Sequence, residues 1–153
     1  MKIAVGSDHA GYMLKQGVLR FLTERRFEFK DFGVFSEDPA DYPDVGFEVA
    51  RAVANGEFDR GILICSTGIG MSITANKVPG VRAALCVDTH CALLSREHND
   101  ANVLVLGERV TRADVALEIV DTWLSAVFPG EERHARRIRK ISEIEREYNR
   151  GGC

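Results

Sequence analysis

The stretch of sequence that decides the fold reads Gly61-Ile62-Leu63-Ile64-Cys65-Ser66-Thr67-Gly68-Ile69-Gly70. Its first five residues are continuously apolar, which is typical of a strand covered by helices on both faces. The polar residues and two glycines that follow are typical of a loop leading from a strand into a helix. The stretch therefore predicts a buried parallel strand whose carboxyl end opens into a ligand-binding loop.

The same alternation of short apolar runs and helical patterns extends outward over the whole chain. Strand candidates lie at residues 2–6, 27–32, 61–65, 82–87 and 103–106, and apolar stripes with helical spacing at 14–22, 45–53 and 115–127. Alternating strands and helices predict a parallel sheet with helices on both faces. We therefore predict one domain, residues 1–153, in which a Rossmann-like five-stranded parallel sheet forms the centre of a three-layer α/β/α sandwich.

Residues 131–149 predict a last helix of different character. Ile138, Ile141 and Ile144 are its main apolar positions, and charged residues surround them. A stripe this thin buries little surface against its own domain. The pattern fits a helix that packs on a partner subunit, and it also fits a peripheral helix on its own core.

Composition and charge exclude several functions. The net charge of −3 gives no reason to expect nucleic acid or an anionic membrane as partner. No apolar run reaches the length of a membrane span, and the chain enters its first strand too early for a signal peptide. The cysteines have neither metal-ligand nor C-x-x-C spacing, which predicts reduced thiols in the cytoplasm and no metal site; they are Cys65, Cys86, Cys91 and Cys153.

Candidate site residues gather where strands end, because ligands of open parallel sheets bind beyond the carboxyl ends of the strands. Asp8 and His9 follow the first strand, and Arg109 follows the fifth. The loop after the third strand contributes Cys65, Ser66, Thr67, Gly68, Ile69 and Gly70, whose successive amides can form a nest for negative charge.

Three interpretations of this loop compete. Dinucleotide binding would use Gly68-x-Gly70, but Ile73 stands where the fingerprint needs a third small residue. A cysteine phosphatase loop would need an arginine where Met71 stands. In the third interpretation the amides hold an oxyanion that develops during reaction, and Cys65 moves a proton next to a carbonyl, as aldose–ketose isomerisation requires. Taken alone, the cysteine also fits a small core residue.

Histidines and arginines supply the remaining candidates. Either His9 or His98 could open a sugar ring by proton transfer, and each also fits a cap or loop hydrogen bond. Arginine suits phosphate oxygens, although surface decoration fits these positions as well; the candidates are Arg109, Arg133 and Arg137. Asn99 follows His98 in a polar cluster, and His90 and His134 are weaker candidates.

Five segments in this order and spacing resemble the type B ribose-5-phosphate isomerases, a family that includes allose- and galactose-6-phosphate isomerases. They are Ser7-Asp8-His9-Ala10-Gly11, Asp41-Tyr42-Pro43-Asp44, Ile64-Cys65-Ser66-Thr67-Gly68-Ile69-Gly70-Met71-Ser72, Ala75-Asn76-Lys77 and Arg96-Glu97-His98-Asn99-Asp100-Ala101-Asn102. The similarity spans essentially the whole chain. It implies a homodimer, sometimes paired into tetramers, with active sites at the subunit interface and no metal or organic cofactor.

The resemblance also implies roles for individual residues. Cys65 matches the base that moves the C2 proton, and the amides of residues 66–70 match the hole that holds the enediolate. His98, supplied by the partner subunit, matches the ring-opening group, with Thr67 close by. The remaining matches are sugar or phosphate contacts; they are Asp8, His9, Asn99, Arg109, Arg133 and Arg137.

Two departures from the family pattern stand out. Ser66 occupies a position where many members carry glycine, and Glu131-Glu132 replaces a more common Gly-Gly. We predict reversible isomerisation of D-ribose 5-phosphate and D-ribulose 5-phosphate through a cis-enediolate. Another four- or six-carbon sugar phosphate is the alternative substrate, and a non-catalytic sugar-phosphate sensor is the alternative function.

Overall fold

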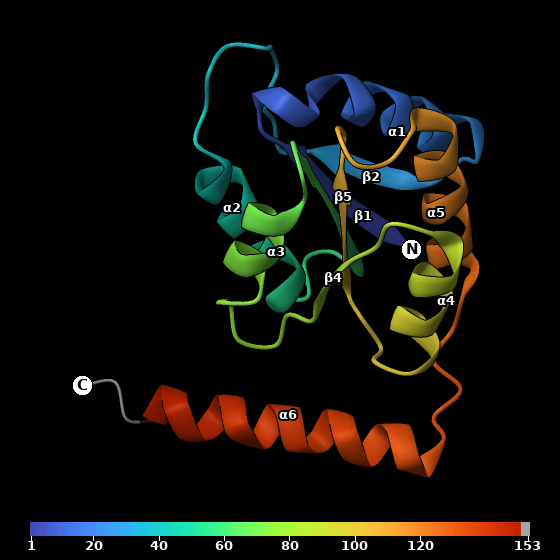
Figure 1. The fold of residues 1–153 in the computed structure, drawn as a ribbon. Helices are drawn as coiled ribbons and strands as arrows, with labels where there is room; N and C mark the ends of the chain where they lie inside the picture. The colour runs from blue at the N-terminus through green and yellow to red at the C-terminus, as the bar shows by residue number, and fades with distance from the viewer. Residues whose placement is uncertain (151–153) are drawn as a thin grey trace.

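The computed structural model describes residues 1–150 and confirms the three-layer α/β/α sandwich (Figure 1). The five parallel strands are β1 (Lys2–Ser7), β2 (Glu28–Asp31), β3 (Arg60–Cys65), β4 (Ala83–Leu85) and β5 (Val103–Gly107). The helices are η1 (His9–Gly11), α1 (Tyr12–Glu24), α2 (Tyr42–Ala54), α3 (Ile69–Ala75), α4 (Thr89–Glu97), α5 (Ala113–Ser125) and α6 (Glu132–Arg150). The predicted free thiol of Cys153 lies outside the described residues.

Each central strand sends alternate side chains into two separate cores. In β3, Ile62 and Ile64 pack on one side of the sheet, and Leu63 and Cys65 pack on the other. Helices α1, α4 and α5 cover the first face, whereas α2 and α3 cover the second. Burial on both faces explains why these strands are continuously apolar in sequence.

The two edge strands are shorter than their apolar patterns predict. β2 pairs only with β1, and β4 pairs only with β5, so each has a ladder on one side alone. The predicted runs of 27–32 and 82–87 shrink to four and three residues. A strand with one neighbour has fewer hydrogen bonds to hold its ends extended.

The strand order β2-β1-β3-β5-β4 places the switch point between β1 and β3. After β1 the chain adds β2 on the outer side of β1. After β3 it adds β4 and β5 on the outer side of β3, in the direction away from β1. Ser7 lies beside Ile64 in the ladder, and the Asp8 amide donates to the Ile64 carbonyl at 3.2 Å. The ends of β1 and β3 therefore meet at the crevice where such sheets bind ligands.

Helix α6 lies apart from the other helices, across the opposite edge of the sheet (Figure 1). This edge holds the amino ends of the strands. Near its carboxyl end, α6 is tied to the turn after α3, where the Gly80 amide donates to Glu145 at 2.9 Å. Within residues 1–150, no helix is long and apolar enough to cross a membrane.

Candidate active site

The thiol of Cys65 stands at the last position of β3 and is 4% exposed. Its sulfur accepts a hydrogen bond from the Gly68 amide at 3.1 Å. The thiolate is the form of a cysteine that can act as a base, and this contact fixes the sulfur beside the loop. The structure therefore pairs the predicted base with an amide of its own loop.

Backbone contacts hold this loop in place. The Glu108 amide donates to the Cys65 carbonyl and the Arg109 amide to the Ser66 carbonyl, both at 2.9 Å. A Cβ on Gly107 would lie 2.6 Å from the Thr67 carbonyl carbon, so the end of β5 touches the loop directly. Such close packing leaves the loop one conformation.

Gly68 is needed for its conformation and for its size. Its φ of +81° lies in the left-handed region, and a Cβ there would come within 2.4 Å of Leu85. Helix α3 begins directly after it, and the first intrahelical bond runs from the Ser72 amide to the Gly68 carbonyl. The amides of Gly70 and Met71 consequently have no acceptor within the helix.

Tyr42 is a wall of the site that the sequence analysis did not select. A Cβ on Gly70 would lie 2.7 Å from the Tyr42 ring, so the ring rests on the glycine backbone. Tyr42 is the first residue of α2 and remains exposed. Its membership of the Asp41-Tyr42-Pro43-Asp44 segment was the available signal.

Asp8 and His9 stand beside the loop at the end of β1. The buried Asp8 carboxylate caps η1 by accepting from the Gly11 amide at 3.0 Å. The Ala40 amide donates to His9 Nδ1 at 3.1 Å. Nδ1 also lies 3.2 Å from the Ala40 carbonyl oxygen, so the Ala40 backbone holds this side of the ring and Nε2 is the nitrogen left for a ligand.

The structure brings nine of the predicted residues together at the carboxyl edge of the sheet. They are Asp8, His9, Cys65, Ser66, Thr67, Gly68, Ile69, Gly70 and Arg109. Arg109 is exposed, and within residues 1–150 it forms no ion pair. This carboxyl-edge group combines a thiol, backbone donors and one arginine.

The other four predicted residues lie at the opposite edge. α4 runs back from the carboxyl edge to the amino edge, and His98 and Asn99 follow its end. Arg133 and Arg137 lie in the first half of α6. These four residues, which we call the amino-edge group, do not meet Cys65 within one chain.

Two arginines that the sequence analysis missed hold the segment after α4. Asp100 accepts from Arg96 at 2.8 Å and from Arg82 at 3.0 Å, and its φ is +47°. Arg82 Nε also donates to the Asn99 carbonyl at 3.0 Å. The i, i+4 spacing of Arg96 and Asp100 was the only local signal for this clamp.

His134 makes a contact that the sequence did not reveal. Its ring stacks on the ring of His98 with centroids 4.1 Å apart and an interplanar angle of 8°. Burial lowers the pKa of His134, and the nearby charges of His98, Arg133 and Arg137 lower it further, against an opposing effect of Glu131. His134 is therefore neutral near pH 7.

The described residues contain no group of three or more His, Cys, Asp or Glu side chains that could hold a metal ion. Within them Cys65, Cys86 and Cys91 are free thiols.

A buried thiol beside glycine-loop amides at the switch point of a parallel sheet has the parts that an isomerase of the aldose–ketose class requires. The particular family follows from comparison with known proteins. Residues 3–141 match the Ribose/Galactose Isomerase family, and the chain belongs to that family. The predicted resemblance is confirmed.

Individual relatives agree with this assignment. Ribose-5-phosphate isomerase B of Escherichia coli K12 is 49% identical over 148 residues, which cover 97% of this chain and 99% of the relative. The structure of ribose-5-phosphate isomerase B from Clostridium thermocellum is 59% identical with a TM-score of 0.95, covering 97% of this chain and 99% of its own. A crystal structure of the Mycoplasma genitalium enzyme with bound ribulose 5-phosphate is 44% identical with a TM-score of 0.90, covering 95% and 97%.

Proposed function

We propose that this protein interconverts D-ribose 5-phosphate and D-ribulose 5-phosphate, with Cys65 as the base. The observation that carries the proposal is the Cys65 thiol, held at the end of β3 with the Gly68 amide 3.1 Å from its sulfur. The relatives named ribose-5-phosphate isomerase B and the related structure with ribulose 5-phosphate support the choice of substrate.

The chemistry is a proton shift between neighbouring carbons. The Cys65 thiolate takes the C2 proton of the open-chain aldose, and the C1 carbonyl oxygen becomes an enediolate oxygen. Amides of the loop, including those of Gly70 and Met71, stabilise the developing negative charge. The thiol returns the proton to C1 while the hydroxyl proton on O2 passes to O1, which leaves a C2 carbonyl. No electron donor or acceptor outside the sugar is required.

Replacement of Cys65 by alanine tests the base. We expect kcat for ribose 5-phosphate to fall by several orders of magnitude while the substrate still binds, because the loop amides remain. Cys86→Ala is the matched control: burial raises the pKa of that thiol to about 11, and it lies in the core on the other face of the sheet. It should keep its kcat. Unchanged turnover in Cys65→Ala would remove the thiol from the mechanism.

A panel of aldose phosphates with four to six carbons tests the substrate. Ribose 5-phosphate should have the highest kcat/KM. A six-carbon sugar phosphate with a higher value would overturn the ribose assignment and leave the isomerase class intact.

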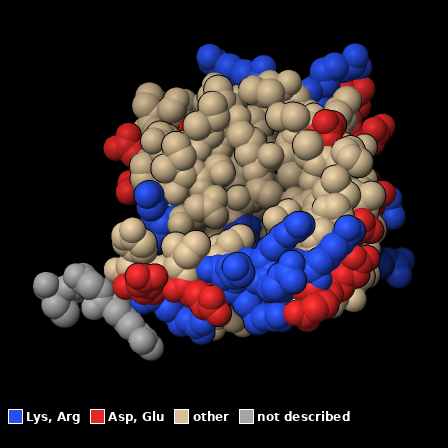
Figure 2. Space-filling model, turned by 60° about the horizontal axis from the view of Figure 1, so that its bottom comes forward, with Lys and Arg blue, Asp and Glu red and all other residues tan. Residues whose placement is uncertain are grey.

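We further propose that two subunits share each active site, with the carboxyl-edge group from one chain and the amino-edge group from the other. The two groups lie at opposite edges of one sheet, so a single chain cannot assemble them. Figure 2 shows basic side chains gathered along α6 at the amino edge, with acidic ones interleaved. Arg137 forms no ion pair within residues 1–150, and Arg133 pairs only with exposed Glu131 at 3.0 Å, so both can reach a phosphate.

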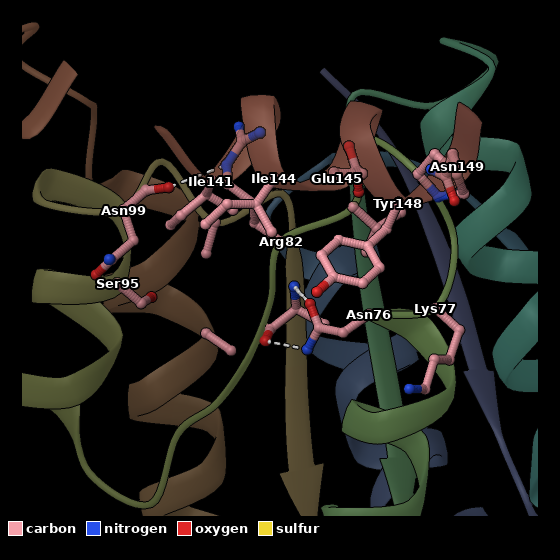
Figure 3. A pocket seen from close by; sticks show the side chains of 15 residues that line it. Asn76, Lys77, Arg82, Ser95, Asn99, Ile141, Ile144, Glu145, Tyr148 and Asn149 are labelled. Atoms are coloured by element: carbon pink, nitrogen blue, oxygen red, sulfur yellow. Dashed lines mark hydrogen bonds between the residues drawn. The ribbon is translucent and has the colours of Figure 1, made fainter. Parts of the chain in front are cut away.

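The underside of α6 supports this pairing. A cavity of about 730 Å³ separates α6 from the body of the domain, and Ile141 and Ile144 point into it (Figure 3). These two side chains are 49% and 58% exposed, and Asn99 lines the same cavity. The two exposed isoleucines are apolar surface that a second subunit could cover, and the cavity leaves room for such a covering surface. A dimer, alone or paired into a tetramer, would supply the covering surface.

The free thiols fit our prediction that the enzyme works in the cytoplasm.

A further inference from the structure

The feature that carries a further inference is the contact between His98 and His134. Helix α6 is exposed along most of its length, and among its described side chains His134 alone is buried, at 4% exposure. It lies in the first turn of the helix, and its amide donates to the Glu131 carbonyl at 2.9 Å. The start of α6 is thus placed against the body of the domain by this ring.

The stack fixes the plane of the His98 ring. With centroids 4.1 Å apart and planes within 8° of parallel, one face of His98 is covered, and the stack itself uses neither ring nitrogen. A hydrogen bond would orient the ring equally well, but it would occupy one nitrogen. Face-to-face contact orients an imidazole and leaves both of its nitrogens available for proton transfer.

Ring opening of a furanose phosphate has this requirement. The group that opens the ring takes the proton from the anomeric hydroxyl O1 and delivers a proton to the ring oxygen O4 as the C1–O4 bond breaks. Both proton transfers run along the edge of the imidazole, and their rate depends on correct placement.

The charged groups around His134 favour a stacked ring that carries no charge. Glu131 lies 3.9 Å from Nε2, while Arg133 and Arg137 are the cations nearby. Nε2 is buried and has no hydrogen-bond partner within residues 1–150. Because a charged ring here would repel a protonated His98, the neutral form is the one that can stack through the reaction.

We propose that His134 is a positioning residue for ring opening, and that its stacked imidazole holds His98 in the orientation that proton transfer at the anomeric hydroxyl requires. The inference rests on the proposed function, in which His98 opens the ring.

The test compares a cyclic and an open-chain substrate. Ribose 5-phosphate is almost entirely a furanose, whereas ribulose 5-phosphate cannot close a five-membered ring because its O5 carries the phosphate. Initial isomerisation rates from ribose 5-phosphate are measured for the wild type, His134→Ala, His134→Phe and His98→Ala. Exchange of the C1 hydrogen of ribulose 5-phosphate with D2O is measured for the same proteins, because it reports proton transfer at carbon and needs no ring opening or closure.

His134→Ala should lower kcat/KM from ribose 5-phosphate by roughly 10- to 100-fold, as expected for a misplaced proton-transfer group. The rate of C1-hydrogen exchange in ribulose 5-phosphate should fall by less than about threefold, and His98→Ala should show the same asymmetry between isomerisation and exchange. His134→Phe keeps a stacking ring of similar size without a titrating group, so it should restore most of the rate from ribose 5-phosphate and also preserve the start of α6.

Two results would overturn the proposal. Equal losses of isomerisation and of C1-hydrogen exchange in His134→Ala would show that the residue serves phosphate binding or the fold. No recovery in His134→Phe would show that the stack is not what orients His98. Failure of the proposed function is separate from both, because the wild type would then convert neither substrate.

Discussion

The carboxyl edge and the amino edge of the sheet hold their functional residues in different ways. At the carboxyl edge, backbone amides and glycine contacts define the loop after β3, with Gly68 and Gly107 packed against neighbouring atoms. At the amino edge, charged side chains and a ring stack hold His98 and Asn99. The proposed base is therefore held by the backbone of the fold, whereas the proposed ring-opening residue is held by side chains near the surface.

The largest effect should come from crowding the carboxyl edge. Gly107→Ala places a Cβ 2.6 Å from the Thr67 backbone, so the loop must move away from its amide positions. We expect kcat to fall by about two orders of magnitude and the free energy of unfolding by about 1–3 kcal/mol.

Gly17→Ala is the control for this change, because nothing lies within 4 Å of its added Cβ in α1. It should keep kcat and gain up to about 1 kcal/mol in helix stability. Steady-state kinetics and urea unfolding measure both quantities. Equal kcat and equal unfolding free energy in Gly107→Ala and Gly17→Ala would contradict a rigid carboxyl edge.

A smaller effect should follow from loosening the amino edge. Arg96 is 2% exposed and binds Asp100 and the Ala101 carbonyl, so Arg96→Met leaves both acceptors short of a donor. We expect a loss of about 2 kcal/mol in the free energy of unfolding and a lower kcat/KM from ribose 5-phosphate.

Arg112→Met removes an ion pair of the same kind at the surface, with Asp114, and should cost less than about 1 kcal/mol without affecting kcat/KM. Urea unfolding and initial rates compare the two. If Arg96→Met left the rate from ribose 5-phosphate unchanged, the clamp would have no part in placing His98.

The smallest effect concerns pH. Burial lowers the pKa of His134 below its usual 6.5, so the unfolded chain takes up a proton more readily than the folded one as the solution is acidified. The stability that the neutral ring contributes is fully present above 6.5 and is lost as the pH falls below it. The urea midpoint should therefore drop between about pH 7.5 and pH 5.5, and it should drop less in His134→Phe. An identical drop of the urea midpoint in the wild type and in His134→Phe would contradict a buried neutral ring.

The sequence predicted those parts of the molecule that depend on neighbouring residues. The buried strands and the Cys65 loop are continuous in sequence, so their pattern was readable. Helix α4 was not predicted, because its apolar stripe is weak and its start depends on Asp88, whose side chain accepts from the Cys91 amide at 2.6 Å. The lengths of β2 and β4 were not predicted either, because they depend on how many strands each one pairs with in the sheet.

The amino edge was less predictable for a similar reason. Arg82 reaches Asp100 across 18 residues, and nothing in the sequence indicates which acidic side chain it binds. His134 sits in a highly charged helix, where the sequence favours an exposed position. Its burial depends on how α6 crosses the sheet edge, which only the tertiary structure shows.

The central claim is that each active site combines Cys65 of one subunit with His98 of another. Mixing Cys65→Ala and His98→Ala proteins under conditions of confirmed subunit exchange tests it directly by activity on ribose 5-phosphate. If the site is shared, half of the dimers are mixed and each holds one intact site, so about a quarter of wild-type activity should return. Activity that stays at the level of the separate variants would contradict a shared site.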